Sequence, residues 1–153
     1  MNKTPDQRDP DWPRYPETVL TFATQPPLEI DLRAIPSDYA IAQLKAMGFG
    51  EPFAILTAFD PDGRNLSATD NDRRKQELDR RLTSMGYEFA QVDCCSPDRS
   101  HCESSVAIKM PQREALDLAR EMRQVAIFWF DGKRFWILGA LVKADPLMLP
   151  RSS

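Results

Sequence analysis

Short apolar runs, separated by proline, glycine and acidic turn residues, divide the chain into segments of strand or helix length. The run at residues 53–59 is apolar except for Thr57 and ends at Asp60-Pro61-Asp62-Gly63, so it predicts a buried strand followed by a turn. Similar patterns predict further strands at residues 18–23, 28–32, 87–93, 105–109, 125–130 and 134–142.

Three segments carry the start and stop signals of helices. Residues 37–47 follow a proline and end before a glycine, and residues 112–123 place alanine, leucine and methionine on one face. Residues 69–85 form the longest predicted helix, with Thr69 or Asp70 as its N-cap. Helices therefore alternate with the predicted strands.

The dipeptide Asp131-Gly132 lies between two aromatic runs and predicts a hairpin with a two-residue turn. In that register Phe128 lies opposite Phe135 on the face that contributes to the core. The other face carries Trp129 and Trp136, and we expect the N-terminal strands to cover it. A surface for a partner protein is the alternative interpretation of these aromatic residues.

From residue 53 onward the predicted order is strand, helix, strand, strand, helix, strand, which is the βαββαβ order of a ferredoxin-like split β-α-β core. An extra C-terminal hairpin strand and an N-terminal β-β-α extension complete the predicted α+β fold. Helix crossovers make the first two strands parallel, with the third antiparallel between them. This routing brings distant polar residues to one edge of the sheet and predicts a polar cleft there: Thr57, Asp60, Asn71, Arg74, His101, Glu103, Ser105 and Gln124.

Composition favours one domain at residues 17–144 and excludes some functions. Residues 1–16 are rich in proline and poor in apolar groups, which predicts a flexible lead-in, and residues 145–153 resemble them as a tail. Twenty basic and 23 acidic residues give a net charge of −3, which disfavours binding to nucleic acid. No apolar run reaches the ~20 residues that span a bilayer, so we expect a soluble, cytoplasmic protein with no membrane partner.

The three cysteines, Cys94, Cys95 and Cys102, lie with His101 in one short segment. Their odd number and the size of the domain predict reduced thiols rather than a disulfide framework. Adjacent cysteines on a strand point to opposite faces, so we expect neither a zinc site nor any other metal or cofactor. A thiol nucleophile with His101 as its base is a less favoured alternative.

The residues of the predicted cleft offer two kinds of chemistry. Arg74 lies at a helix N-terminus, where a phosphate or carboxylate is favoured, and Thr57, Asn71, Ser105 and Gln124 add hydrogen-bonding groups. Glu103 and His101, two residues apart on an extended segment, face the same way and suit a general base and acid, with Asp60 assisting.

A structural role for these residues is the alternative to each functional one. Asn71 would then cap its helix, while Arg74 would pair with Asp70 or Asp60. Glu103 would instead accept backbone N–H groups of the turn that begins at Asp60.

Several of these residues also carry a resemblance. Thr57-Ala58-Phe59-Asp60-Pro61, Asn71, Glu103-Ser104-Ser105 and Gln124-Val125-Ala126-Ile127-Phe128 resemble the pattern of the bacterial domain-of-unknown-function family 3293, over about residues 53–129. The chain departs from that pattern at Asp60 and Val125, where the family usually shows asparagine. The resemblance implies no activity, substrate or cofactor.

These observations predict a site for a small anionic or nucleotide-like ligand. A hydrolase or transferase that uses Glu103 as general base is one alternative. The other is an acidic module that binds a partner protein or regulates it, through the aromatic hairpin or the N-terminal arm.

Overall fold

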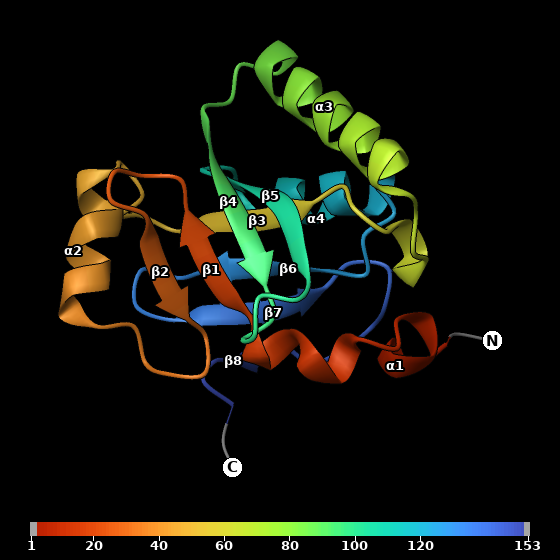
Figure 1. The fold of residues 1–153 in the computed structure, drawn as a ribbon, viewed down its shortest axis with the longest axis horizontal. Coiled ribbons are helices and arrows are strands. Elements are labelled where there is room, and N and C mark those ends of the chain that lie inside the picture. The colour runs from red at the N-terminus through yellow and green to blue at the C-terminus, as the bar shows by residue number, and fades with distance from the viewer. Residues whose placement is uncertain (1–2, 152–153) are drawn as a thin grey trace.

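Eight strands make up the framework of the computed structural model, which describes residues 3–151 (Figure 1). In chain order they are β1 (Val19–Phe22), β2 (Leu28–Asp31), β3 (Phe53–Thr57), β4 (Phe89–Cys95), β5 (Cys102–Ile108), β6 (Ala126–Phe130), β7 (Phe135–Gly139) and β8 (Leu147–Met148). They form one sheet of order β2-β1-β4-β5-β3-β6-β7-β8, in which every neighbouring pair is antiparallel. The predicted α+β class is confirmed, and β5 lies between β3 and β4.

Four α-helices and two short 3₁₀ helices accompany the sheet. They are α1 (Pro5–Arg8), η1 (Trp12–Glu17), α2 (Asp38–Ala46), η2 (Pro61–Gly63), α3 (Ala68–Ser84) and α4 (Gln112–Glu121). Helices α3 and α4 lie together above the sheet in Figure 1, whereas α2 flanks β2. None of the helices in the described part of the chain combines the length and apolarity that crossing a bilayer requires.

The sheet curls, so its two faces bury two different apolar clusters. Alternation along β3 sends Ala54 and Leu56 toward α3 and α4, and Phe53 and Ile55 into the curl. Inside the curl the strands β1 and β4, in front in Figure 1, pack against β6 and β7 behind them. The cavity described below lies on this inner side.

Helix α3 begins one or two residues before the predicted start. Its N-cap is Ser67, whose Oγ accepts a hydrogen bond from the backbone N–H of Asp70 at 3.1 Å. The prediction of Thr69 or Asp70 as the cap was therefore wrong. Serine, threonine and aspartate side chains can all accept a hydrogen bond from a backbone N–H of the first helical turn. Ser67, Thr69 and Asp70 were therefore all suitable caps by sequence.

The terminal hairpin differs from its predicted register. Phe130 pairs with Phe135 and Trp129 with Trp136, so Phe128 lies opposite Ile137 rather than Phe135. The reason is Asp131, whose Oδ1 accepts the backbone N–H groups of Lys133 and Arg134, both at 2.8 Å, and stabilises a four-residue loop. Hydrogen bonds of one carboxylate thus override the two-residue turn that Asp-Gly favours.

The face that carries Trp129 and Trp136 is covered, but not by the N-terminal strands. Both side chains pack, partly buried, against the apolar cluster that α3 and α4 form with the sheet. The indole N–H of Trp136 donates to Asp131 Oδ2 at 2.8 Å. This arrangement leaves the hairpin little free aromatic surface for a partner.

Both ends of the described chain form secondary structure. Residues 3–16, where composition predicts a flexible lead-in, contain α1 and most of η1, and Trp12 and Tyr15 pack against the cluster inside the curl. Arg8 Nε lies 2.7 Å from Asp62 Oδ1 and joins this segment to η2. At the other end β8 pairs with β7 and Leu149 is buried, while residues 1, 2, 152 and 153 lie outside the described residues.

Candidate functional site

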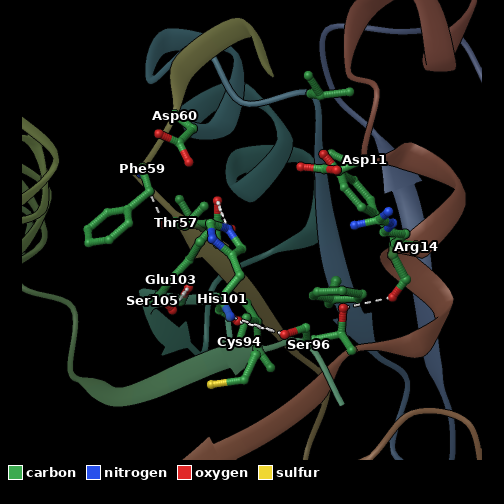
Figure 2. A pocket seen from close by; sticks show the side chains of 18 of the residues that line it. Asp11, Arg14, Thr57, Phe59, Asp60, Cys94, Ser96, His101, Glu103 and Ser105 are labelled. Atoms are coloured by element: carbon green, nitrogen blue, oxygen red, sulfur yellow. Dashed lines mark hydrogen bonds and ion pairs between the residues drawn. The ribbon is translucent and has the colours of Figure 1, made fainter. Parts of the chain in front are cut away.

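A cavity of about 210 Å³ opens on the inner side of the curl, between the sheet and η1 (Figure 2). Its walls come from the ends of β3 and β6, the hairpin of β4 and β5, and the N-terminal segment. The polar residues among its lining are Asp11, Arg14, Tyr15, Glu17, Thr18, Thr57, Asp60, Ser96, Ser100, His101, Glu103, Ser105 and Gln124. The floor is apolar, with Ile55 and Phe128 among its residues.

Three titratable side chains converge on one side of this cavity. Alternation along β5 directs Glu103 and Ser105 into the curl, and His101 precedes them on the same face, as predicted. His101 Nε2 lies 3.8 Å from Glu103 Oε1. Asp60, at the end of β3, joins them, and one ligating atom from each of the three side chains lies within 4.8 Å of the others. Figure 2 shows this group across the cavity from Asp11 and Arg14.

The environment of Glu103 favours its protonated form. Its side chain is only 27% exposed, and burial raises the pKa of the carboxyl above its usual range. The imidazole of His101 opposes this shift, while Asp60 and Asp9 add to it. A carboxyl with a raised pKa in a cavity is the condition under which glutamate exchanges protons near neutral pH.

The same neighbours favour the protonated, positively charged form of His101. The side chain is 59% exposed. Its interaction with the Glu103 carboxylate raises the pKa of the imidazole, burial opposes the rise, and Asp60 and Asp11 reinforce it. The two groups titrate as a coupled pair, so each proton belongs to the pair rather than to one residue.

Asp60 is held in place by Asn71. The backbone N–H of Asp60, which has a left-handed conformation with φ of 48°, donates to Asn71 Oδ1 at 2.9 Å. Asn71 Nδ2 returns a hydrogen bond to Asp60 Oδ1 at 3.0 Å, and that oxygen also accepts the N–H of Leu66. Asn71 is only 6% exposed and does not line the cavity.

Arg74 is occupied by backbone carbonyl groups. Its Nε donates to the carbonyl oxygen of Ala58 at 2.6 Å, and its Nη2 donates to that of Met122. These contacts tie α3 to the end of β3 and to the end of α4. Like Asn71, Arg74 does not line the cavity, and its predicted pairing with Asp70 or Asp60 was wrong.

The other predicted binding residues do line the cavity, and each also makes a structural hydrogen bond. Thr57 Oγ1 donates to the carbonyl of Ser104 at 3.1 Å, and Ser105 Oγ donates to that of Glu103 at 3.1 Å. Gln124 Nε2 donates to the carbonyl of Phe59 at 3.1 Å, while its Oε1 accepts no hydrogen bond from the described residues. These groups therefore shape the wall of the cavity.

Glu103 does not serve the turn that begins at Asp60, which was the structural alternative for it. The N–H of Asp60 goes to Asn71, and that of Asp62 goes to the carbonyl of Arg123 at 2.7 Å. No described residue donates a hydrogen bond to the Glu103 carboxylate, and its nearest charged partner is the imidazole of His101, with Nε2 3.8 Å from Oε1. A partly buried carboxylate that lines a cavity without hydrogen bonds from the protein favours a functional role.

Two of the three cysteines form a disulfide, so the prediction of reduced thiols was wrong for them. Cys95 and Cys102 are bonded, and they are directly opposite each other in the ladder of β4 and β5. The sequence pattern placed them in a loop, whereas β4 ends two residues later and β5 begins three residues earlier than predicted. Cys94, opposite Glu103, is free, and burial raises the pKa of its thiol to about 12. A thiol that stays protonated at neutral pH makes a poor nucleophile.

The wall contributed by the N-terminal segment was missed by the sequence interpretation. Asp11, Arg14, Tyr15 and Glu17 line the cavity. The hydroxyl of Tyr15 donates to Asp9, and burial raises the pKa of that phenol. The signal for this wall was the pair of aromatic residues in an otherwise polar, proline-rich segment.

The group of Asp60, His101 and Glu103 has the composition of ligands for a divalent cation. Zinc in catalytic sites takes three protein ligands and a water molecule, and these residue types are suitable. Asp60 Oδ1, however, already accepts two hydrogen bonds, from Asn71 and Leu66. A cation bound by all three side chains would therefore compete with the hydrogen bonds that hold Asp60.

Comparison with known proteins identifies a family for the central part of the chain. Residues 56–127 match the family described as "Protein of unknown function (DUF3293)", which confirms the resemblance seen in the sequence. A search of curated proteins and a search of solved structures each found no match.

Proposed function

We propose that this chain, whose residues 56–127 match the model of the DUF3293 family, is a hydrolase or group transferase that uses Glu103 as a general base. One observation carries the proposal. The Glu103 side chain lines a cavity, burial raises the pKa of its carboxyl, and its one ion-pair partner among residues 3–151 is the imidazole of His101. Proton transfer by a positioned side chain of this kind contributes roughly 10²–10⁴-fold to a reaction rate.

The charges around the cavity favour a neutral or cationic substrate. Asp11, Glu17, Asp60 and Glu103 contribute carboxyl groups to the lining, whereas Arg14 is the one arginine or lysine there among the described residues. An anionic ligand has less support than the sequence suggested, because Arg74 donates to backbone carbonyls outside the cavity. Like charges that line a cleft repel a ligand of the same sign.

The two neighbouring groups have complementary roles in the proposed reaction. Glu103, as carboxylate, accepts the proton of an attacking water or hydroxyl. His101, 3.8 Å away and with a raised pKa, stabilises that carboxylate and holds a proton for the leaving group. Asp60 adds to this effect, because its negative charge also raises the pKa of His101.

The segment from β3 to β6 supports a finer description of the fold as well. Its elements follow the order strand, helix, strand, strand, helix, strand, and its four strands lie in the order β4-β5-β3-β6. We assign this segment to the split β-α-β type, with β1, β2, β7 and β8 as additions at the two edges.

Hydrolysis of chromogenic esters by the full chain tests the function. p-Nitrophenyl acetate, acetylthiocholine and p-nitrophenyl phosphate supply a neutral, a cationic and a dianionic substrate, each assayed with and without EDTA. We expect turnover of the neutral or cationic ester, and a loss of roughly 10²–10⁴-fold in kcat for Glu103→Gln. Glu88→Gln, at an exposed position outside the cavity lining, is the matched control.

Two results would contradict this function. One is equal turnover by the parent and Glu103→Gln. The other is a preference for the dianionic ester, which would restore the anionic-ligand hypothesis. Loss of activity in EDTA would indicate that Glu103 binds a cation instead of transferring a proton.

A further inference from the structure

We propose that the Cys95–Cys102 disulfide is a redox-controlled clamp that holds His101 against Glu103 at the cavity, and that its reduction releases His101 while the rest of the fold persists. Its regulatory consequence rests on the function proposed above. The clamp concerns only the position of the His101 side chain, and it is tested separately from the function.

The disulfide lies at the place where the β4–β5 ladder ends. Cys95 and Cys102 are the last residue pair of that ladder, and their Cα atoms are 4.1 Å apart. The bond closes the short loop of residues 96–101, of which His101 is the final residue, adjacent to Cys102. A covalent link at this pair therefore fixes the backbone from which the imidazole projects.

The remaining interactions of this loop are exposed to solvent. Ser96 N–H donates to the carbonyl of His101 at 2.8 Å, and Asp98 Oδ1 accepts from Ser100 at 3.0 Å. Arg99, with φ of 64°, reaches Thr21 and Glu29 on β1 and β2. Exposed hydrogen bonds and ion pairs contribute only about 0–1.5 kcal/mol each, so the loop opens readily once the covalent link is gone.

The side chain of His101 is 59% exposed, so packing contributes little to keeping it in place. Its neighbours are the charged groups Glu103, Asp60 and Asp11. Its position near Glu103 thus depends on the backbone of the loop. In contrast, Glu103 projects from within β5, whose pairing with β3 and β4 does not require the disulfide.

The chemistry of the three cysteines restricts exchange to one pair. Cys102 is exposed, whereas Cys95 is only 4% exposed, so a thiolate from an external dithiol attacks Cys102 Sγ. The S–S bond breaks, Cys95 leaves as a thiolate that takes up a proton, and a mixed disulfide forms at Cys102. The second thiol of the reagent then attacks its own sulfur in that bond, which gives the cyclic oxidised reagent and a free Cys102 thiol.

This exchange transfers two electrons from the dithiol to the protein disulfide. Cys94 does not compete, because burial keeps its thiol protonated at neutral pH. The same pair can therefore re-form on oxidation without scrambling. A reversible change confined to one loop end is what a switch requires.

The chain contains a single histidine, so one imidazole resonance reports its state directly. We would titrate the His101 Hε1 signal by NMR in tag-free protein, oxidised with diamide or reduced with dithiothreitol. The oxidised protein should show a pKa above 6.5, and reduction should lower it toward that ordinary value as the imidazole leaves Glu103. Reoxidation should restore the original titration curve.

Two variants serve as controls for this measurement. Cys102→Ser should show the lower pKa under both conditions, and Cys94→Ser should respond to dithiothreitol as the parent does. Counting thiols with Ellman's reagent should give one free thiol in the oxidised denatured protein and three in the reduced protein.

Identical titration curves for the oxidised and reduced protein would overturn the clamp, as would three free thiols after oxidation. Loss of the near-UV circular dichroism spectrum on reduction would also overturn it, because the disulfide would then maintain the whole fold. None of these readouts needs a substrate. Failure of the ester assay with a normal redox response of His101 would reject the function and retain the clamp.

Discussion

Two groups of polar side chains lie close to the end of β3, and they differ in what they bind. Asn71 and Arg74 are satisfied by the protein itself, since they hydrogen-bond to Asp60, Ala58 and Met122. Glu103 and His101 line the cavity, and the one ion pair that either side chain makes among the described residues is with the other. The first group builds the rim of the cavity, and the second is available for chemistry.

The difference shows that convergence of polar residues does not by itself define a site. Buried polar groups normally carry hydrogen bonds to the protein, as Asn71 does. The Glu103 carboxylate is only partly buried and lacks them, and burial raises its pKa, which is a combination that clusters at functional sites. The following predictions set the two groups against each other, beginning with the largest expected effect.

Replacing Arg74 should damage stability most. Arg74→Met removes two hydrogen bonds from a charged donor and leaves the carbonyls of Ala58 and Met122 without it, which costs about 3 kcal/mol or more. Urea unfolding measures this loss. Arg73→Met is the matched control, because the Arg73 side chain is 73% exposed and should change stability by less than about 0.5 kcal/mol. Equal effects of the two variants would show that Arg74 is not part of the framework.

Asn71→Ala should have an intermediate effect. It removes the reciprocal hydrogen bonds with Asp60 and leaves the Asp60 N–H unpaired, at a cost of about 1–3 kcal/mol. The exposed neighbour Asp72→Ala provides the comparison in the same unfolding experiment. A stability unchanged by Asn71→Ala would place Asn71 among the binding residues instead.

The pH dependence of stability should separate Glu103 from the other carboxyl groups. Its folded pKa is raised above the unfolded value, so the folded state binds the proton more tightly and stability falls as pH rises from the usual glutamate range toward the raised pKa. Asp62 has the opposite sign, since Arg123 lowers its pKa, and its contribution is lost as pH falls. Subtracting the Glu103→Gln profile from that of the parent should leave the falling component alone, and a rising difference would contradict this.

The smallest effect should be on the acid limb of the pH–rate profile. His101 lowers the pKa of Glu103 against the effect of burial, so His101→Asn should move the acid limb of kcat to higher pH. A general base acts only in its deprotonated form, so a higher pKa of Glu103 moves the acid limb to higher pH. A shift to lower pH would show that His101 does not face the Glu103 carboxylate in solution.

The sequence predicted local features well and pairing partners less well. Alternation along a strand correctly placed His101 and Glu103 on one face, and turn chemistry marked the turn that follows β3, which begins at Asp60. The disulfide was not predictable, because it depends on β4 extending two residues beyond its predicted end and β5 starting three residues before its predicted start. The role of Arg74 was not predictable either. Every residue carries a backbone carbonyl, so no sequence pattern indicates which one a side chain will reach.

The wall from the N-terminal segment was missed for a further reason. Composition weighs all residues of a segment together, whereas docking depends on a few anchors such as Trp12 and Tyr15 and on one ion pair of Arg8 with Asp62. Gly63 permits that contact, because a Cβ atom there would lie 2.5 Å from the carbonyl oxygen of Arg8.

The free energy of unfolding of Glu103→Gln at neutral pH tests the central distinction most directly. If Glu103 is held in the cavity for chemistry, removing its charge relieves the cost of burial, and the variant should unfold at a higher urea concentration than the parent and Glu88→Gln. If Glu103 belongs to the framework as Asn71 does, the variant should instead lose stability of the order of 1 kcal/mol or more, and the proposed separation of the two groups would be contradicted.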